Sequence, residues 1–206
     1  MSSPALLPAD GARLLAIARQ AVRAHLEEGP PPALPAEGPL AERRGAFVTV
    51  HVGAALRGCI GTFAPEEALA GTVARMAVLA ASQDPRFRPL RREELEGATF
   101  HVSVLGPRRR MQDPKEVEVG RDGILVQLGW RRGTLLPRVA VEEGWDAVTF
   151  LERTCLKAGL APGAWRAPEA VVELFSAEEL GEAPGPPPPG EGQGPGSAPP
   201  PGGERP

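Results

Sequence analysis

The feature that most constrains the fold is a pair of β-rich runs separated by only two residues. Phe47–Val52 is rich in β-branched residues, and Ala55–Thr62 follows it directly after Gly53 and Ala54. A two-residue connection with glycine first suits a type II′ turn, which joins antiparallel strands into a hairpin. The sequence therefore predicts an antiparallel sheet that contains this hairpin.

Helical patterns flank the hairpin on both sides. Asp10–Glu28 has apolar residues at helical spacing behind Asp10, a favourable N-cap, and stops at Gly29 and a run of prolines. A second helix is expected from Pro65 to about Ser82, with proline and acidic residues in its first turn. Shorter helices are expected at 91–96, 138–143 and 146–158, and further strands at 98–105, 123–128, 134–136 and 170–175. The mixture indicates the α+β class.

Composition divides the chain into three segments. Residues 1–9 form a short N-terminal lead, residues 10–182 carry the α+β domain, and residues 183–206 form a tail. Seventeen of the 24 tail residues are glycine or proline. Such a segment cannot bury enough apolar surface to offset its ordering entropy, so the tail is expected to be disordered.

Charge and hydropathy exclude several classes of protein. The net charge of −3 provides no overall basic field, so nucleic-acid binding is not expected. No run approaches the roughly 20 apolar residues that span a bilayer, and no signal peptide is evident, so we expect a cytoplasmic protein without a membrane partner. The two cysteines, Cys59 and Cys155, are a poor disulfide framework.

Cys59 is the candidate for covalent chemistry. Alternation along a strand places Arg57 and Cys59 on one face, where the guanidinium would favour the reactive thiolate. Gly58 and Gly61 carry no side chains, so a ligand or another backbone segment can approach closely.

The structural alternative is that Cys59 is a small core residue and that the glycines shape a bulge. If Val52 pairs with Ala55 across the turn, Val48 lies opposite Cys59, and an apolar neighbour suits burial. Chemistry alone leaves both interpretations open.

Two further clusters are candidates for ligand binding. In the loop Asp84–Phe87, Asp84 could orient Arg86 to hold a carboxylate or phosphate; alternatively, the loop is a rigid turn whose aspartate caps the backbone. Arg132 lies in a basic turn beside Trp130 that could stack on a base, although a solvated, charged hairpin tip is the commoner explanation of such a turn. The histidines show no metal-ligand spacing, so no metal site is predicted; phosphate-loop, dinucleotide and hydrolase motifs are absent.

Six phrases, taken in order, resemble the AMMECR domain family, whose bacterial members are called AmmeMemoRadiSam system protein A. The most specific is Leu56-Arg57-Gly58-Cys59-Ile60-Gly61-Thr62. The others are Asp84–Phe87, Val102–Leu105, Arg132-Gly133 with Leu135-Leu136-Pro137, Val139–Glu142 with Gly144-Trp145, and Cys155–Leu160. The chain departs from the family pattern at Arg88, His101 and Arg138.

The resemblance implies a mixed, mostly antiparallel sheet with flanking helices, in two unequal lobes forming one domain. It also implies a setting beside Memo-type and radical SAM proteins, without a settled activity or a known cofactor. Two hypotheses follow. The chain is an enzyme component with Cys59 as nucleophile and Arg57 as activator, or it is a non-catalytic adaptor for a small anionic ligand, a protein partner or nucleic acid. The residues expected to line the ligand site are Gly58, Gly61, Thr62, Asp84, Arg86 and Arg132.

Overall fold

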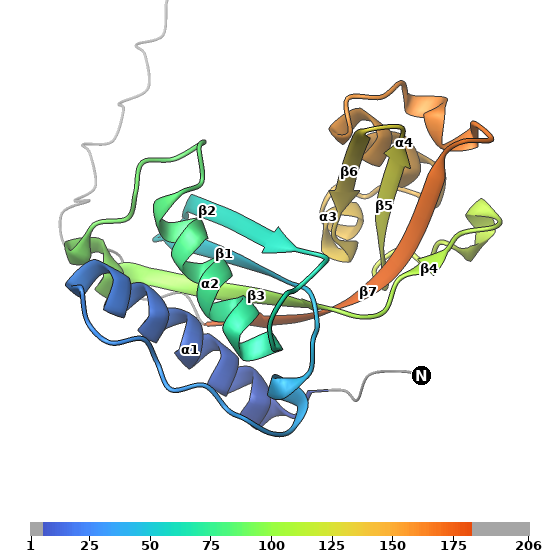
Figure 1. The fold of residues 1–206 in the computed structure, drawn as a ribbon. Coiled ribbons are helices and arrows are strands. Elements are labelled where there is room, and N and C mark those ends of the chain that lie inside the picture. The colour runs from blue at the N-terminus through green and yellow to red at the C-terminus, as the bar shows by residue number, and fades with distance from the viewer. Residues whose placement is uncertain (1–5, 183–206) are drawn as a thin grey trace, which may run out of the picture.

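A computed structural model describes residues 6–182 (Figure 1). The expected disordered tail, 183–206, and residues 1–5 of the lead lie outside the described residues. Within the described part, one curled sheet has the strand order β2-β1-β3-β7-β5-β6, and the short β4 pairs with β7. Every pairing in this sheet is antiparallel, which confirms the α+β class, whereas the expectation of a mixed sheet is wrong for the described residues. The division into two lobes remains a prediction.

The elements follow the expected order along the chain. The strands are β1 (Ala46–Val52), β2 (Ala55–Thr62), β3 (Ala98–Leu105), β4 (Arg109–Arg110), β5 (Asp122–Leu128), β6 (Arg131–Leu135) and β7 (Val171–Gly181). The α-helices are α1 (Pro8–Glu27), α2 (Leu69–Ser82), α3 (Pro137–Glu142) and α4 (Ala147–Lys157). Short 3₁₀ helices are η1 (Pro39–Ala41), η2 (Arg92–Gly97), η3 (Pro114–Glu116) and η4 (Pro162–Arg166).

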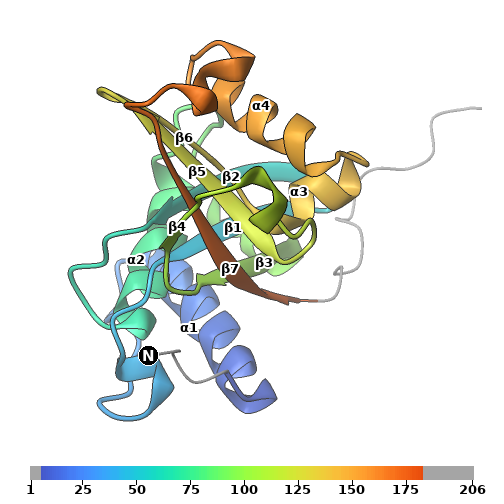
Figure 2. The same ribbon diagram turned by 90° about the vertical axis from the view of Figure 1, so that its right-hand side faces the viewer.

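Strand β7 connects the two halves of the sheet. Its first half pairs with β5 and β4, and its second half, from Ala177 to Gly181, pairs with β3 (Figure 2). The expected strand at 170–175 was therefore too short. The reason is that the polar residues beyond it are bound by the rest of the fold: Ser103 donates to Glu179, and Arg44 pairs with Glu178.

Two main apolar clusters hold the described part of the chain together. Helices α1 and α2 cover one face of β2-β1-β3, where Val48, Val50 and Phe100 are fully buried (Figure 1). Helices α3 and α4 pack on β5 and β6, around Phe150 and Ile124. Removal of this apolar surface from water is the main force that holds the helices on the sheet. The opposite face of β2-β1-β3 is left for the site described below.

Two helices begin elsewhere than the sequence predicted. Helix α1 begins at Pro8, so Asp10 is not its N-cap but lies in the first turn, where its carboxylate accepts a hydrogen bond from the backbone N–H of Leu7. The proline ring presets the helical φ at that position. Helix α2 begins at Leu69 rather than Pro65, because the Leu69 N–H donates to the carbonyl of Glu42 in the preceding segment.

Candidate functional site

A cleft of about 510 Å³ opens on the face of β2-β1-β3 that the helices α1 and α2 do not cover. Its other wall comes from β6, the start of α3 and the end of α4. The lining residues are Phe47, Thr49, His51, Leu56, Cys59, Ile60, Asp84, Pro85, Arg86, His101, Ser103, Thr134, Leu136, Arg138, Val139, Lys157 and Glu179. Six of these residues are apolar and ten are polar or charged, so the cleft combines apolar surface with groups that can bind or orient a ligand.

The alternation of β1 decides which side chains reach this cleft. Val48 and Val50 are fully buried against the helices, so Thr49 and His51 point to the opposite face. In the ladders, Cys59 on β2 and His101 on β3 both lie opposite Thr49. A thiol, a hydroxyl and an imidazole therefore form one row across three adjacent strands.

Cys59 lies in this row half-buried and within reach of the cleft. The Thr49 hydroxyl donates a hydrogen bond to its sulfur, with 3.3 Å between Oγ1 and Sγ. Its backbone N–H donates to a carboxylate oxygen of Asp84 at 2.9 Å. The thiol thus has a fixed position, and the expectation that Cys59 belongs to the apolar core is wrong.

Asp84 and Arg86 form the rigid side of the cleft. The Asp84 side chain is 2% exposed and accepts hydrogen bonds from Nε and Nη2 of Arg86 at 2.9 and 2.7 Å. These bonds lower the pKa of Asp84 well below its usual range, against the opposing effect of burial. They also raise the pKa of Arg86, to which nearby Cys59 makes a smaller contribution. Asp84 therefore orients Arg86 and also caps its backbone N–H, as expected, whereas binding of an anion by Arg86 remains a prediction.

Arg57 does not take the place expected of it. Val50 pairs with Gly58 and His51 pairs with Leu56, which leaves Arg57 as the extra residue of a β-bulge. Its guanidinium binds the carboxylate of Glu94 at 2.5 Å, outside the cleft. Leu56 and Cys59, rather than Arg57 and Cys59, therefore line the cleft.

The same bulge overturns the expected register of the hairpin. Val52 does pair with Ala55, and Gly53 has the positive φ of 58° that a type II′ turn requires at its first central position. Beyond the bulge, however, the partner of Cys59 is Thr49 and not Val48. The extra residue shifts the pairing by one position, so the thiol meets a hydroxyl instead of an apolar side chain.

The two glycines of the signature run serve packing. A Cβ on Gly58 would lie 1.9 Å from the carbonyl oxygen of Ala80 in α2. A Cβ on Gly61 would lie 2.2 Å from the ring of Phe47, its partner on β1. Gly58 is buried and does not line the cleft, so the close approach that was predicted is that of another backbone segment rather than a ligand.

A second hollow of about 440 Å³, which we call the side hollow, adjoins the cleft. The two share Phe47, Thr134 and Lys157. The side hollow contains three of the predicted ligand-site residues, Gly61, Thr62 and Arg132. The structure therefore brings Cys59, Asp84 and Arg86 together in the cleft and these three in the hollow beside it, whereas Arg57 and Gly58 lie outside both.

The polar cleft residues that sequence reasoning missed include Thr49, His51, His101 and Lys157. The rings of His51 and His101 meet edge to face with 5.4 Å between their centroids. Nδ1 of His51 is buried without a hydrogen-bond partner, and burial, followed by the charges of His101 and Arg138, lowers the pKa of His51. The alternation around Val48 and Val50 could have identified Thr49 and His51; no sequence signal places Lys157 here.

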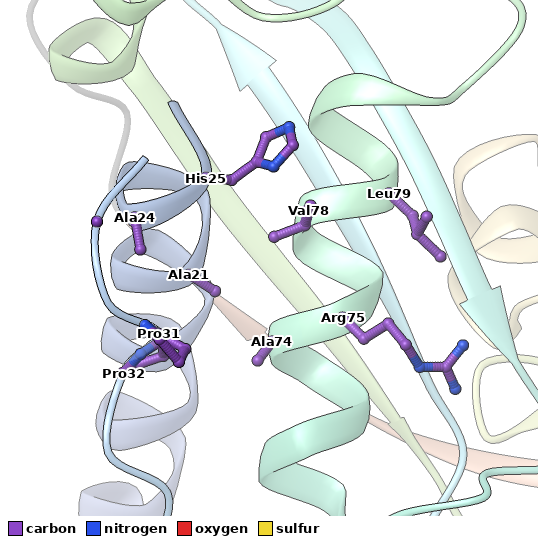
Figure 3. A pocket seen from close by; sticks show the side chains of 10 residues that line it. Ala21, Ala24, His25, Pro31, Pro32, Ala74, Arg75, Val78 and Leu79 are labelled. Carbon is purple, nitrogen blue, oxygen red and sulfur yellow. The ribbon is translucent and has the colours of Figure 1, made fainter. Parts of the chain in front are cut away.

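Other features of residues 6–182 do not compete with this cleft. An apolar hollow of about 370 Å³ lies between α1 and α2, where Ala21, Ala74 and Val78 meet Pro31 and Pro32 (Figure 3). It gathers no set of reactive side chains. Over the same residues, no three His, Cys, Asp or Glu side chains come together as metal ligands. None of the described helices is long and apolar enough to cross a bilayer.

The fold and the cleft together define an α+β protein whose antiparallel sheet presents a thiol to a partly polar cleft. The model of the AMMECR1 family matches residues 15–180, so the chain belongs to the AMMECR1 family.

The chain is similar to proteins of comparable length from several archaea. It is 42% identical over 177 residues to a protein of Methanothermobacter thermautotrophicus, covering 82% of this chain and 92% of that one. It is 42% identical over 183 residues to Protein MK0488 of Methanopyrus kandleri, covering 84% and 88%. Among solved structures, it is similar to uncharacterized protein PH0010 from Pyrococcus horikoshii, with a TM-score of 0.76, 39% identity, and coverage of 82% and 89%.

Proposed function

We propose that the chain is a cysteine-dependent enzyme component whose substrate binds in the cleft and reacts at Cys59. The observation that carries the proposal is the hydrogen bond from Thr49 to the Cys59 sulfur at the floor of the cleft. A hydroxyl that donates to sulfur orients it and stabilises negative charge that it carries during attack, and the Arg86 guanidinium lies nearby, paired with Asp84.

In this proposal the cation beside the thiol is Arg86, and not Arg57 as the sequence suggested. The Cys59 thiolate attacks an electrophilic carbon of the substrate, so that an S–C bond forms while the bond from that carbon to its leaving group breaks. The leaving group departs with the electron pair and takes up a proton from water. Asp84 acts as a positioning residue, because it holds both the Cys59 backbone and the Arg86 side chain.

The family resemblance supports a role for this activity in a modification system with Memo-type and radical SAM proteins. Both partners are part of the proposal.

The test compares the two cysteines of the native protein. Iodoacetamide is added at neutral pH, and alkylation of each cysteine is followed by mass spectrometry of peptides. Cys59 should react faster than a model thiol, while Cys155, which is fully buried, should react only after unfolding and so serves as internal control. Labelling of Cys59 only after denaturation would overturn the proposal.

The alternative function is that of a non-catalytic binding module, for which the thiol of Cys59 is not required. Cys59→Ala should leave the affinity for a co-purifying ligand or partner unchanged if the site only binds. The alternative is favoured by the cations around the cleft, among which Arg86 and Lys157 approach Cys59. Native mass spectrometry of the protein from its own host, with and without Cys59→Ala, distinguishes an adduct on the thiol from a ligand that is merely bound.

A further inference from the structure

The side hollow has an unusual charge balance. Its nine lining residues are Phe47, Gly61, Thr62, Phe63, Ala64, Arg132, Gly133, Thr134 and Lys157, and none of them is acidic. Arg132 and Lys157 therefore bring two positive charges to a hollow without a carboxylate in its wall. Isolated cations next to each other repel, so this arrangement is more favourable when an anion lies between them.

Neither cation is neutralised elsewhere in the described part of the chain. Arg132 lies over the ring of Phe63, 5.5 Å from its centroid, and has no carboxylate among its contacts within residues 6–182. Phe63 is itself held edge to face by Phe47 and Phe175. Most other arginines that contact the sheet are paired, as Arg57 is with Glu94 and Arg86 with Asp84.

Close packing of β6 on α4 brings the segments of the two cations to one hollow. Gly133 packs so closely on the end of α4 that a Cβ there would lie 2.5 Å from the backbone nitrogen of Ala158. Arg132 and Lys157 are the chain neighbours of these two residues, so this packing brings the segments that carry the two cations together at the hollow. Thr62, at the end of β2, adds a hydroxyl group that can donate to an anion.

We propose that the side hollow binds the phosphate group of a small phosphorylated ligand through Arg132, Lys157 and Thr62. Two cations and a hydroxyl suit a phosphate monoester, which carries up to two negative charges and several acceptor oxygens. Because Lys157 and Thr134 line both spaces, a ligand bound here extends into the cleft toward Cys59. Only this last step rests on the proposed function.

Protonation of Lys157 gives the proposal a second readout. Partial burial lowers the pKa of Lys157; Cys59 opposes this effect and the charge of Arg86 adds to it. A bound phosphate favours the charged ammonium and so raises this pKa. Phosphate should therefore reduce the fraction of Lys157 present as the free, acylatable amine, in addition to covering it.

The chain offers a direct experiment because it contains only two lysines, Lys157 and the exposed Lys115. The native protein is treated with acetic anhydride in HEPES buffer, and acetylation at each lysine is followed by mass spectrometry. Inorganic phosphate at about twice its dissociation constant should slow acetylation of Lys157 about threefold by mass action, and sodium chloride of equal ionic strength should not. Lys115 should respond to neither.

Two variants locate the effect. Arg132→Ala should abolish the protection of Lys157 by phosphate, because it removes one of the two charges of the hollow. Arg110→Ala removes the same charge from an exposed position on β4 and should leave the protection unchanged. Equal protection by chloride, equal protection of both lysines, or protection that survives Arg132→Ala would overturn the phosphate site.

Alkylation of Cys59 in the same samples separates this inference from the proposed function. Protection of Lys157 together with an unreactive Cys59 supports the phosphate site and counts against the thiol chemistry. A reactive Cys59 without any protection of Lys157 overturns the phosphate site alone.

Discussion

The hydroxyl of Thr49 donates to the sulfur of Cys59 across the β1–β2 ladder, over a distance of 3.3 Å. Thr49→Val keeps the shape of the side chain and removes this donor. A hydrogen bond of about 1 kcal/mol corresponds to about a fivefold change in the equilibrium or rate that it favours. We therefore expect Thr49→Val to slow alkylation of Cys59 by iodoacetamide about fivefold at neutral pH.

The control for this substitution is Thr134→Val, on the opposite wall of the cleft. Its hydroxyl donates to the carbonyl of Ile124 and does not contact Cys59. It should leave the alkylation rate unchanged. Equal rates in Thr49→Val and in the native protein would show that the hydroxyl has no influence on the thiol.

Arg57 is expected to matter for stability and not for reactivity. Its side chain is 12% exposed and binds Glu94, whose side chain is 18% exposed. Arg57→Ala leaves that carboxylate with fewer partners and should lower the free energy of unfolding by about 2 kcal/mol, the usual value for a hydrogen bond to a charged group. Urea unfolding measures the loss, and alkylation of Cys59 should keep its native rate. A large drop in that rate with unchanged stability would return Arg57 to the role that the sequence suggested.

Gly58 tests the packing of β2 on α2. A Cβ at this position meets the backbone of Ala80 at 1.9 Å, and backbone cannot move aside as a side chain can. Gly58→Ala should therefore cost about 3 kcal/mol of unfolding free energy, the upper end of the usual range for overpacked core positions. Gly97→Ala is the matched control, because a Cβ there has open space around it and its φ is not positive. A similar melting temperature for both variants would contradict this account.

The elements of the fold could be predicted from local signals. Gly53 between two β-rich runs marked the hairpin of β1 and β2, and alternation identified β3 with its observed bounds. Contacts between segments that are distant in the sequence could not be predicted. Helix α2 begins where the Leu69 N–H donates to the carbonyl of Glu42. Strand β7 extends as far as its residues pair with β3.

The site was predicted in its residues more than in its geometry. Cys59, Asp84 and Arg86 were identified, and the structure brings them together in the cleft. The role of Arg57 was misjudged because a single bulge residue changes which side chains share a face of the strand. The prediction from alternating side chains assumes a strand without a bulge. Lys157 reaches the cleft only through packing of α4 on β6, which no run of neighbouring residues reveals.

The acid limb of the stability curve should depend on Glu94. Burial alone would raise the pKa of this carboxyl, but hydrogen bonds from Arg57, the Arg91 backbone and Arg88 lower it from 4.5 to about 2. A depressed pKa contributes stability that is fully present above pH 4.5 and is lost as the pH falls toward 2. At about 1.4 kcal/mol per unit, the contribution is on the order of 3 kcal/mol.

Glu94→Gln should therefore lower the free energy of unfolding at pH 6 and converge with the native protein near pH 2. Urea unfolding at a series of pH values measures the difference between the two curves. Glu93→Gln removes the same charge from an exposed neighbour and should run parallel to the native curve throughout. Protonation of Glu94 and its replacement by glutamine abolish the same ion pairs. If the difference in unfolding free energy between Glu94→Gln and the native protein stayed constant down to pH 2, Arg57 and Arg88 would not hold this carboxylate in its charged form.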